Sequence, residues 1–217
     1  MGNDNINRIF WGIKMSFDET AKIWDTEIRI NRAKKIAEEI SKSINIDKNY
    51  SAMEFGCGTA LLSFNLYDKF KEITLIDTSQ GMIDVVKSKI KKYEVNNMFT
   101  NNTDISNKNS LDMEFDVIYN SLVLHEIHNT EGVIKNFYEL LNKDGYLCIV
   151  DLDEEDGSFH KNYPDFHGHN GFNQDKLKCV LRSAGFKDIE SNTFYYDVKA
   201  IGDEKIKYSL FLMKAKK

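Results

Sequence analysis

The chain has 217 residues, of which 41% are hydrophobic and 29% are charged, and its formal net charge at pH 7 is -5. This length suits one packed domain better than two, and the composition is that of a globular chain rather than a disordered or fibrous one. The mild negative charge argues against a broad positive surface for the phosphate backbone of a nucleic acid.

Membrane association and secretion are also disfavoured. No apolar stretch approaches the roughly 18 residues that a membrane span needs, and the first twenty residues hold no apolar run of signal-peptide length. Cys57, Cys148 and Cys179 have no paired or metal-type spacing, which favours free thiols in a reducing compartment. We expect a soluble, cytoplasmic protein with neither a membrane nor a nucleic acid as partner, and the oligomeric state stays open.

The first predicted element is a helix that ends near residue 45. Its apolar residues recur at the three- and four-residue spacing of one buried face: Ala33, Ile36, Ala37, Ile40 and Ile44. We expect residues 1–45 to form an N-terminal helical cap segment, followed by a single domain over residues 46–217.

Short apolar runs then alternate with helical patterns along the chain. The five predicted strands lie at 51–55, 73–76, 98–100, 115–119 and 146–150. Helical patterns follow the first strand at 60–66, the second strand after a cap at Ser79, and the fourth strand after a cap at Thr130. This alternation predicts a parallel sheet covered on both faces, with a ligand crevice at the carboxyl ends of the strands.

The pattern changes near the C-terminus. Residues 173–184 read as a helix that Gly185 ends, and two β-rich segments at 189–198 and 207–213 follow with only a turn at Gly202 between them. An antiparallel hairpin should therefore close the sheet. The predicted fold class is α/β: a Rossmann-like, mostly parallel sheet of seven strands with helices on both faces and a C-terminal antiparallel hairpin.

The first predicted strand runs into a glycine loop, E-F-G-C-G-T over residues 54–59. Glycine allows a sharp turn from strand to helix and lets a ligand approach the backbone. A dinucleotide loop reads G-x-G-x-x-G, but the sixth position here is Leu61. Asp77 ends the second strand, where a carboxylate can accept hydrogen bonds from both hydroxyls of a ribose. The pattern predicts a cofactor that contains adenosine and disfavours NAD.

Four motifs in order carry a family resemblance: E-F-G-C-G-T, T-L-I-D-T-S-Q-G-M, F-D-V-I-Y-N-S-L-V-L-H-E-I and L-N-K-D-G-Y-L-C-I-V-D. Over residues 50–215 the chain resembles class I S-adenosylmethionine-dependent methyltransferases, within the small-molecule branch typified by the ubiquinone and menaquinone biosynthesis enzymes. The resemblance implies an enzyme that moves the methyl group of S-adenosyl-L-methionine onto a small molecule. The chain departs from the family pattern at Ala60, where a third glycine often stands.

The resemblance also assigns the site that binds the methyl donor. Glu54 would anchor either the loop or the amino group of the cofactor, and Asp77 would hold the ribose hydroxyls. Gly56 and Gly58, with the variable Cys57 between them, would lie under the methionine portion. An acid at the end of a strand is otherwise often only a turn or cap residue, which is the alternative for Asp77.

Further residues are implied around the adenine and the sulfonium: Thr78, Met82, Asp104, Ile105, Asn120 and Ser121. The first four would surround the adenine, and the last two would lie beside the sulfonium and the acceptor. Asp104 stands in a polar tract where solvated acids are normal, so an ordinary surface position is its alternative.

Methyl transfer is an in-line displacement at carbon with a neutral thioether leaving, so the enzyme contributes mainly proximity, orientation and exclusion of water. An acceptor that must lose a proton would also need a base. His125, after the fourth strand, is the candidate catalytic residue because the pKa of histidine lies near the working pH. Packing, or lining of the cofactor, is the alternative for His125.

The long segment 151–172 is the predicted substrate lid, because unstructured stretches beyond about 15 residues tend to be functional. Its His160, His167 and His169 would line the acceptor pocket together with Trp24. Trp24 stands in S-F-D-E-T-A-K-I-W-D, which resembles the cap over the cofactor in small-molecule methyltransferases, although simple helix packing explains it equally well. The three histidines lack a standard zinc spacing, so we expect no metal.

Two other classes of function stay open. A noncatalytic or regulatory protein that binds S-adenosylmethionine would share the fold, because fold does not establish activity. An NAD-dependent oxidoreductase would need the glycine pattern that Leu61 interrupts. Methylation of nucleic-acid amino groups is disfavoured, because N-S-L-V over residues 120–123 replaces the Asn/Asp-Pro-Pro-aromatic motif. The acceptor and the atom methylated stay open.

Overall fold

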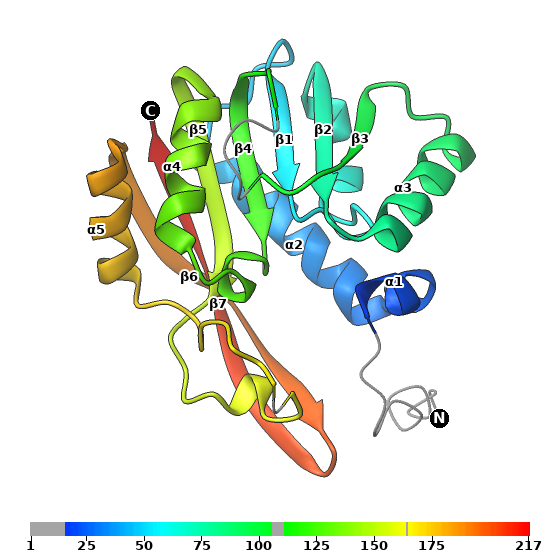
Figure 1. The fold of residues 1–217 in the computed structure, drawn as a ribbon, viewed down its shortest axis with the longest axis vertical. Helices are drawn as coiled ribbons and strands as arrows, with labels where there is room; N and C mark the ends of the chain where they lie inside the picture. Colours follow the sequence, from blue (N-terminus) through cyan, green and yellow to red (C-terminus); the bar gives the residue numbers. More distant parts are fainter. Residues whose placement is uncertain (1–15, 106–110, 164) are drawn as a thin grey trace.

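A computed structural model of the protein describes residues 16–105, 111–163 and 165–217. The strands are β1 (Ser51–Phe55), β2 (Glu72–Asp77), β3 (Met98–Asn102), β4 (Phe115–Ser121), β5 (Leu141–Leu152), β6 (Lys187–Ile201) and β7 (Glu204–Lys216). They form one sheet in the order β3-β2-β1-β4-β5-β7-β6. β1 to β5 pair in parallel, and β7 is antiparallel to both neighbours (Figure 1). The predicted fold class is confirmed.

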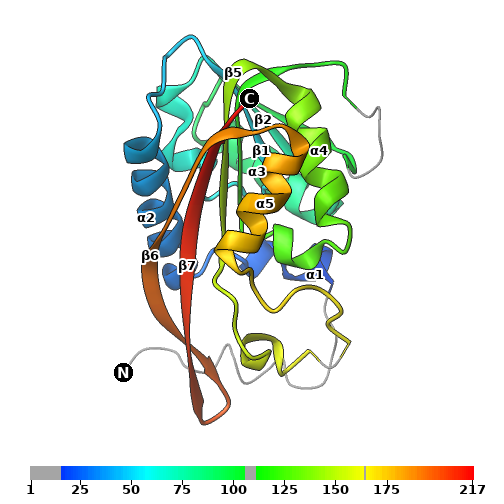
Figure 2. The same cartoon turned by 90° about the vertical axis from the view of Figure 1, so that its left-hand side faces the viewer.

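Helices cover both faces of the sheet, as Figure 2 shows edge-on. One face carries α2 (Glu27–Ser43) and α3 (Gln80–Lys92), and the other carries α4 (Thr130–Leu140) and α5 (Gln174–Ala184). Successive residues of one strand therefore enter different cores: Val117 packs with the α2 and α3 side chains and Ile118 with those of α4 and α5. Burial on both faces explains why the parallel strands read as continuous apolar runs.

Several predicted helix ends agree with the structure. The α2 face over Ala33, Ile36, Ala37 and Ile40 is buried. Ser79 caps α3 by accepting a hydrogen bond from the Met82 amide at 3.1 Å, and Gly185 ends α5 in the left-handed conformation, with φ +106°. The cap of α4 is Asn129 rather than Thr130, because the Asn129 carboxamide accepts from the Gly132 amide at 3.0 Å.

The helix predicted over residues 60–66 is wrong. Two short 3-10 turns, η2 (Ser63–Asn65) and η3 (Tyr67–Lys69), replace it. The backbone is left-handed at Gly58, with φ +51°, and again at Ala60, with φ +60°, and an α-helix cannot pass through such residues. The loop after β1 is therefore longer than predicted.

The N-terminal segment was expected to be helical over residues 1–45, of which 1–15 lie outside the described residues. The described part holds α1 (Phe17–Thr20), η1 (Ala21–Ile23) and α2. No helix in the described ranges is long and apolar enough to cross a bilayer.

The segment 151–172 is folded rather than structureless. β5 continues through Asp151 and Leu152, η5 (Ser158–His160) lies in the middle, and Asp153 forms a β-bridge with Phe172 that closes the loop at its base. The long β6–β7 hairpin extends past the sheet beside this loop (Figure 1). Lys199 of the hairpin donates to the Phe159 carbonyl at 2.7 Å, which fastens the loop to the hairpin.

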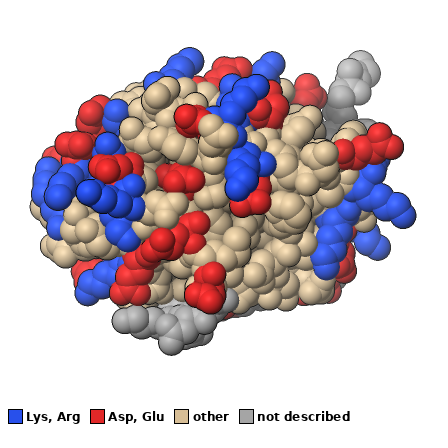
Figure 3. All heavy atoms as spheres, turned by 90° about the horizontal axis from the view of Figure 1, so that it is seen from above, with Lys and Arg blue, Asp and Glu red and all other residues tan. Residues whose placement is uncertain are grey.

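The carboxyl ends of the parallel strands point toward this loop and α1, at the lower edge in Figure 1. From the opposite edge, Lys and Arg side chains are interspersed with Asp and Glu (Figure 3). Because ligands of such sheets bind at the carboxyl ends of the strands, the candidate site lies at the lower edge. There α1, the 151–172 loop and the hairpin surround the strand ends (Figure 1).

Candidate functional site

The glycine loop after β1 is shaped by close backbone packing. Gly56 and Gly58 have φ +66° and +51°, which other residues rarely adopt. A Cβ at Gly56 would lie 2.5 Å from Cγ2 of Val123, so the loop packs directly on the chain that follows β4. The Ala60 that replaces the family's third glycine keeps the left-handed backbone, with φ +60°.

Asp77 ties the end of β2 to this loop. Its Oδ2 accepts from the Gly58 amide at 2.7 Å, and its Oδ1 accepts from the Ser79 amide at 2.8 Å. Burial raises the pKa of Asp77, and the Ser79 and Gly58 amides act against that rise. A carboxylate has about four acceptor positions, so Asp77 keeps capacity for a ribose hydroxyl.

Glu54 lies beneath the loop and is only 3% exposed. The Ser63 hydroxyl donates to its carboxylate and also lies 2.6 Å from the Tyr119 hydroxyl. Burial raises the pKa of Glu54 to about 8. Its contacts are with η2 and β4, and both roles predicted for Glu54, toward the loop and toward the cofactor, stay predictions.

Asn120, which was predicted to lie beside the sulfonium, has a buried side-chain amide without a partner in the described part of the chain. It lies at the end of β4 beside Phe55 of β1 and is fully buried. Neither its side-chain nitrogen nor its side-chain oxygen has a hydrogen-bond partner among the described residues. Buried amides are nearly always paired, so a polar ligand at this edge is the natural partner. Ser121, the next residue, is half-buried.

The residues predicted around the adenine follow β2 and β3. The Asn102 carboxamide donates to the Asp77 carbonyl at 2.9 Å, so the ends of these strands meet. Thr78 and Asp104 are exposed, whereas Met82 and Ile105 are buried. The adenine contacts of these four residues stay predictions.

The N-terminal segment is fastened to α3. Asp18 Oδ1 accepts from the Ser79 hydroxyl at 2.6 Å and from the Gly81 amide at 2.7 Å. The two backbones are so close that a Cβ at Gly81 would lie 2.7 Å from the Asp18 Cα. A carboxylate at a helix N-terminus is also favoured by the helix dipole.

A second set of contacts brings the same segment over the glycine loop. Asp25 accepts from the Thr59 hydroxyl and pairs with the Lys89 ammonium at 3.0 Å. Trp24 Nε1 lies 3.7 Å from the position of a Gly58 Cβ, and the Arg29 guanidinium lies 3.8 Å from the centre of the Trp24 ring. Trp24 thus lies against the glycine loop, and its role as a cap over the cofactor stays a prediction.

His125 lies in η4 (Leu124–Glu126) and is paired with Asp151 at the end of β5. His125 Nδ1 lies 2.6 Å from Asp151 Oδ1, and the His125 amide donates to Asp151 Oδ2 at 3.2 Å. Burial lowers the pKa of His125, but the Asp151 carboxylate overcomes this effect and raises it to about 10. The Asp151 carboxylate thus favours the protonated imidazole, which argues against His125 acting alone as a base.

The three histidines of the 151–172 segment do not converge. His160 lies beside His125, with ring centres 5.2 Å apart, and stacks on Phe166 at 3.8 Å. Burial, followed by the charges of His125 and Lys199, lowers the pKa of His160 to about 4. His169 Nε2 lies 3.0 Å from both the Thr130 hydroxyl and the Ile127 carbonyl. His167 is exposed.

Sequence reasoning missed Asp151 and Glu126 as site residues. Glu126 Oε1 lies 3.5 Å from His125 Nε2. The available signal was topological: Asp151 lies near the end of β5, Glu126 follows the end of β4, and neighbouring parallel strands bring such residues to one edge. Using that signal requires the order of the strands in the sheet, which the sequence motifs do not give.

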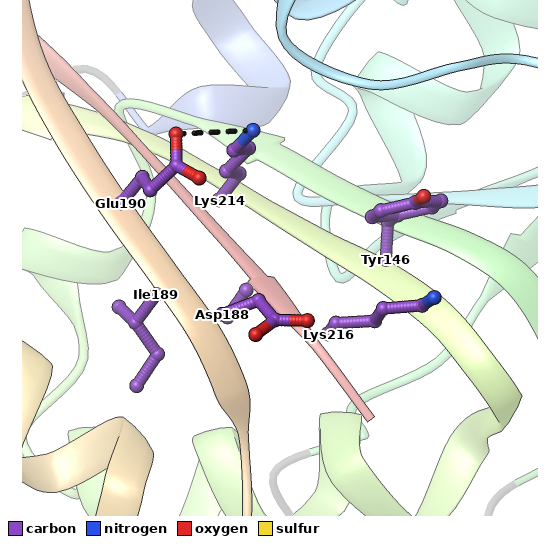
Figure 4. A pocket seen from close by; sticks show the side chains of 7 residues that line it. Tyr146, Asp188, Ile189, Glu190, Lys214 and Lys216 are labelled. Atoms are coloured by element: carbon purple, nitrogen blue, oxygen red, sulfur yellow. Dashed lines mark ion pairs between the residues drawn. The ribbon is translucent and has the colours of Figure 1, made fainter.

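A hollow of about 360 Å³ lies elsewhere, between β5, β6 and β7. Its lining includes Tyr146, Asp188 and Lys216, and an ion pair of 3.2 Å joins Lys214 to Glu190 across it (Figure 4). These residues lie in β5, at the start of β6 and at the end of β7, toward the edge opposite the glycine loop. The hollow is therefore separate from the candidate site.

The sheet order, the antiparallel β7 and the glycine loop after β1 define the class of S-adenosylmethionine-dependent methyltransferases. The chain belongs to the methyltransferase domain family, whose model matches residues 27–191. This membership confirms the resemblance carried by the four motifs.

Two relatives show the range of similarity. The chain is 28% identical over 154 residues to an uncharacterized methyltransferase of Schizosaccharomyces pombe, an alignment that covers 64% of this chain and 54% of the relative. It is 21% identical over 231 residues to the demethylmenaquinone methyltransferase of Geobacillus sp. (strain WCH70), which covers 91% of this chain and 95% of that protein. The chain thus spans about half of the first relative and nearly all of the second.

Among solved structures, the chain is similar to phosphoethanolamine N-methyltransferase 2 of Haemonchus contortus in complex with phosphomonomethylethanolamine and S-adenosylhomocysteine. The TM-score is 0.70 at 14% identity, and the match covers 94% of this chain and 60% of that chain. At this identity the likeness shows a shared fold.

Proposed function

We propose that this protein transfers the methyl group of S-adenosyl-L-methionine to a small-molecule acceptor. Family membership and fold support the reaction class. The observation that carries the proposal is the meeting, at one sheet edge, of the left-handed Gly56–Gly58 loop, the Asp77 carboxylate and the unpartnered Asn120 amide. These three features match the parts of an adenosyl amino acid. The glycine loop lets the ligand approach the backbone, the carboxylate can accept hydrogen bonds from the ribose hydroxyls, and the amide can pair with a polar group of the amino-acid portion.

The residues present fit the methyl donor. When bound, S-adenosylmethionine supplies a methyl group on a sulfonium; the acceptor's lone pair forms the new bond to carbon, and the broken bond's electrons stay on sulfur as a neutral thioether. Asp77 would accept from the ribose, and Asn120 would bond the amino-acid portion or line the sulfonium. Trp24 and Asp25 would hold the cap over the loop and exclude water, which strengthens the polar contacts beneath it.

On the acceptor side we place His125, Trp24 and His160. Asp151 fixes the His125 ring and leaves Nε2 free of that carboxylate. His125 acting alone as the base is not part of this proposal, because Asp151 favours its protonated form. His169 would support the loop that carries His160, and His167 stays a predicted lining residue at the exposed rim.

We further propose that residues 1–45 act as the cap and 46–217 as the catalytic domain. A cytoplasmic location is supported by the free thiols of Cys57, Cys148 and Cys179. The net charge of -5 supports a small-molecule acceptor over a nucleic acid.

Calorimetric titration with S-adenosylhomocysteine and with NAD tests the donor site. We expect binding of the former only. Asp77→Asn should weaken it roughly 10- to 100-fold, because hydrogen bonds to a charged group contribute about 1.5–3 kcal/mol. Asp84→Asn, an exposed acid on α3, is the matched control and should bind like the wild type. Binding of NAD alone, or equal affinity in both variants, would overturn the assignment.

Activity requires its own test, since a noncatalytic protein with this fold would also bind the donor product. We expect radioactive methyl from labelled S-adenosylmethionine to appear in a small molecule of a metabolite extract. The label should not appear with Asp77→Asn at a donor concentration that saturates only the wild type. Binding without any labelled product would favour the regulatory alternative.

A further inference from the structure

Three side chains next to the donor site are arranged as metal ligands. One ligand atom each from His125, Glu126 and His160 lies within 4.8 Å of the others, and His125 Nε2 is 3.5 Å from Glu126 Oε1. Atoms bonded tetrahedrally to one zinc ion at about 2.0–2.2 Å lie about 3.3–3.6 Å apart. The pair of 3.5 Å already fits this spacing, and a small rotation of the side chains would bring in the third ligand.

Asp151 supplies the support that a ligating histidine needs. A histidine that binds a metal through one ring nitrogen almost always donates the other N–H to a carboxylate or carbonyl. His125 Nδ1 lies 2.6 Å from Asp151 Oδ1, which also accepts from the Leu152 amide at 2.7 Å. The fully buried Asp151 thus fixes the ring and leaves Nε2 for another partner, and an ion that binds Nε2 would displace the proton there.

His160 provides an independent observation. It is only 7% exposed, and its Nδ1 has no hydrogen-bond partner within the described parts of the chain. The ring is held by stacking on Phe166 with an interplanar angle of 11°, rather than by hydrogen bonds from both nitrogens. A buried imidazole nitrogen without a protein partner points to a ligand that the chain does not supply.

The cluster of His125, Glu126 and His160 is open to solvent and lies near the donor loop. The Glu126 side chain is 43% exposed, so an ion can enter from solvent. Val123, which packs on Gly56 of the donor loop, precedes His125 by two residues. Three protein ligands leave a coordination position open, as in catalytic zinc sites.

We propose that His125, Glu126 and His160 bind a divalent transition-metal ion beside the methyl donor. Two imidazoles and one carboxylate suit zinc. Sequence spacing suggested no metal, because it compared His160 with His167 and His169; the folded chain instead pairs His160 with residues that follow β4. The ion would activate the methyl acceptor, a role that rests on the proposed function. Binding of the ion itself does not depend on that function.

Zinc chloride titrated calorimetrically into the chelator-treated full chain tests the site. We expect one equivalent to bind, with at least tenfold weaker binding in His160→Ala and in Glu126→Gln. His128→Ala, an exposed histidine three residues from His125, is the matched control and should bind zinc like the wild type. Titration with cobalt chloride should give visible absorption that is lost in the same two variants.

S-adenosylhomocysteine affinity, measured in each variant without metal, shows that the variants are folded and tests the donor site separately. Unchanged zinc stoichiometry and affinity in both His160→Ala and Glu126→Gln would overturn the metal site, as would the absence of zinc binding in the wild type. If the wild type does not bind S-adenosylhomocysteine, the proposed function is refuted instead.

Discussion

At the scale of single residues, Glu54 determines how stability should depend on pH. Its pKa in the folded chain is about 8, against an ordinary value of 4.5, because burial disfavours the charged form. Between these values the folded chain holds a proton that the unfolded chain has lost. The free energy of unfolding should therefore fall as pH rises through this window.

Glu54→Gln removes that proton equilibrium while keeping the shape of the side chain. We expect the wild type to lose on the order of 2–4 kcal/mol between pH 5 and 8 relative to the variant, since each pKa unit corresponds to about 1.4 kcal/mol. Urea unfolding at pH 5, 6.5 and 8 measures the difference. Glu38→Gln, an exposed residue of α2, should keep the wild-type slope; an equal slope in Glu54→Gln would contradict the assignment.

Some site residues could be predicted from sequence and others could not. Gly56, Gly58 and Asp77 belong to local motifs, because a turn or a strand end determines their position. Asp151 could not be assigned its role, because its partner His125 lies 26 residues away and meets it only through the pairing of β4 with β5. The orphaned amide of Asn120 depends on burial, which motifs do not report.

At the scale of elements, α1 lies against the first turn of α3 in a contact that only glycine permits. Gly81→Ala would place a Cβ 2.7 Å from the Asp18 Cα and carbonyl oxygen. We expect the cap to be displaced and S-adenosylhomocysteine affinity to fall roughly tenfold, about 1.4 kcal/mol. Thermal stability should change little, because the preference of alanine over glycine in a helix offsets the loss of the Asp18 hydrogen bonds to Ser79 and Gly81.

Titration calorimetry, thermal unfolding and limited proteolysis of residues 16–26 measure these effects. Gly132→Ala is the control for donor affinity and proteolysis, since the atoms nearest to a Cβ there belong to the Asn129 side chain, which caps α4 rather than contacting α1. Unchanged affinity together with unchanged proteolysis in Gly81→Ala would show that the cap does not cover the donor site.

The elements differ in how clearly the local sequence predicts them. The extent of α5 was predicted closely, because it has one apolar face and clear ends; for α2 the buried face was predicted, but not its start at Glu27. The segment after β1 has a helix-like pattern, but the left-handed Ala60 interrupts it. The fold of the 151–172 loop comes from distant partners such as Lys199, which local sequence does not reveal.

At the scale of the whole molecule, the parallel sheet brings separate segments to one edge. The loop after β1, the acid after β2, the amide at the end of β4 and the His125–Asp151 pair all lie where strands end. The N-terminal cap, the 151–172 loop and the β6–β7 hairpin surround that edge (Figure 1). Alternation of strands and helices predicted this edge as the site, and the sequence also predicted a cap and a 151–172 lid over it, whereas the place of the β6–β7 hairpin beside them required the structure.

A crystal structure of the protein with S-adenosylhomocysteine tests the central claim most directly. We expect the adenosyl group to lie across the Gly56–Gly58 loop, with a ribose hydroxyl bonded to Asp77 and the Asn120 amide paired with the ligand. A complex in which the molecule binds away from this loop, or in which both the Asp77 carboxylate and the Asn120 amide make no contact with it, would contradict the account.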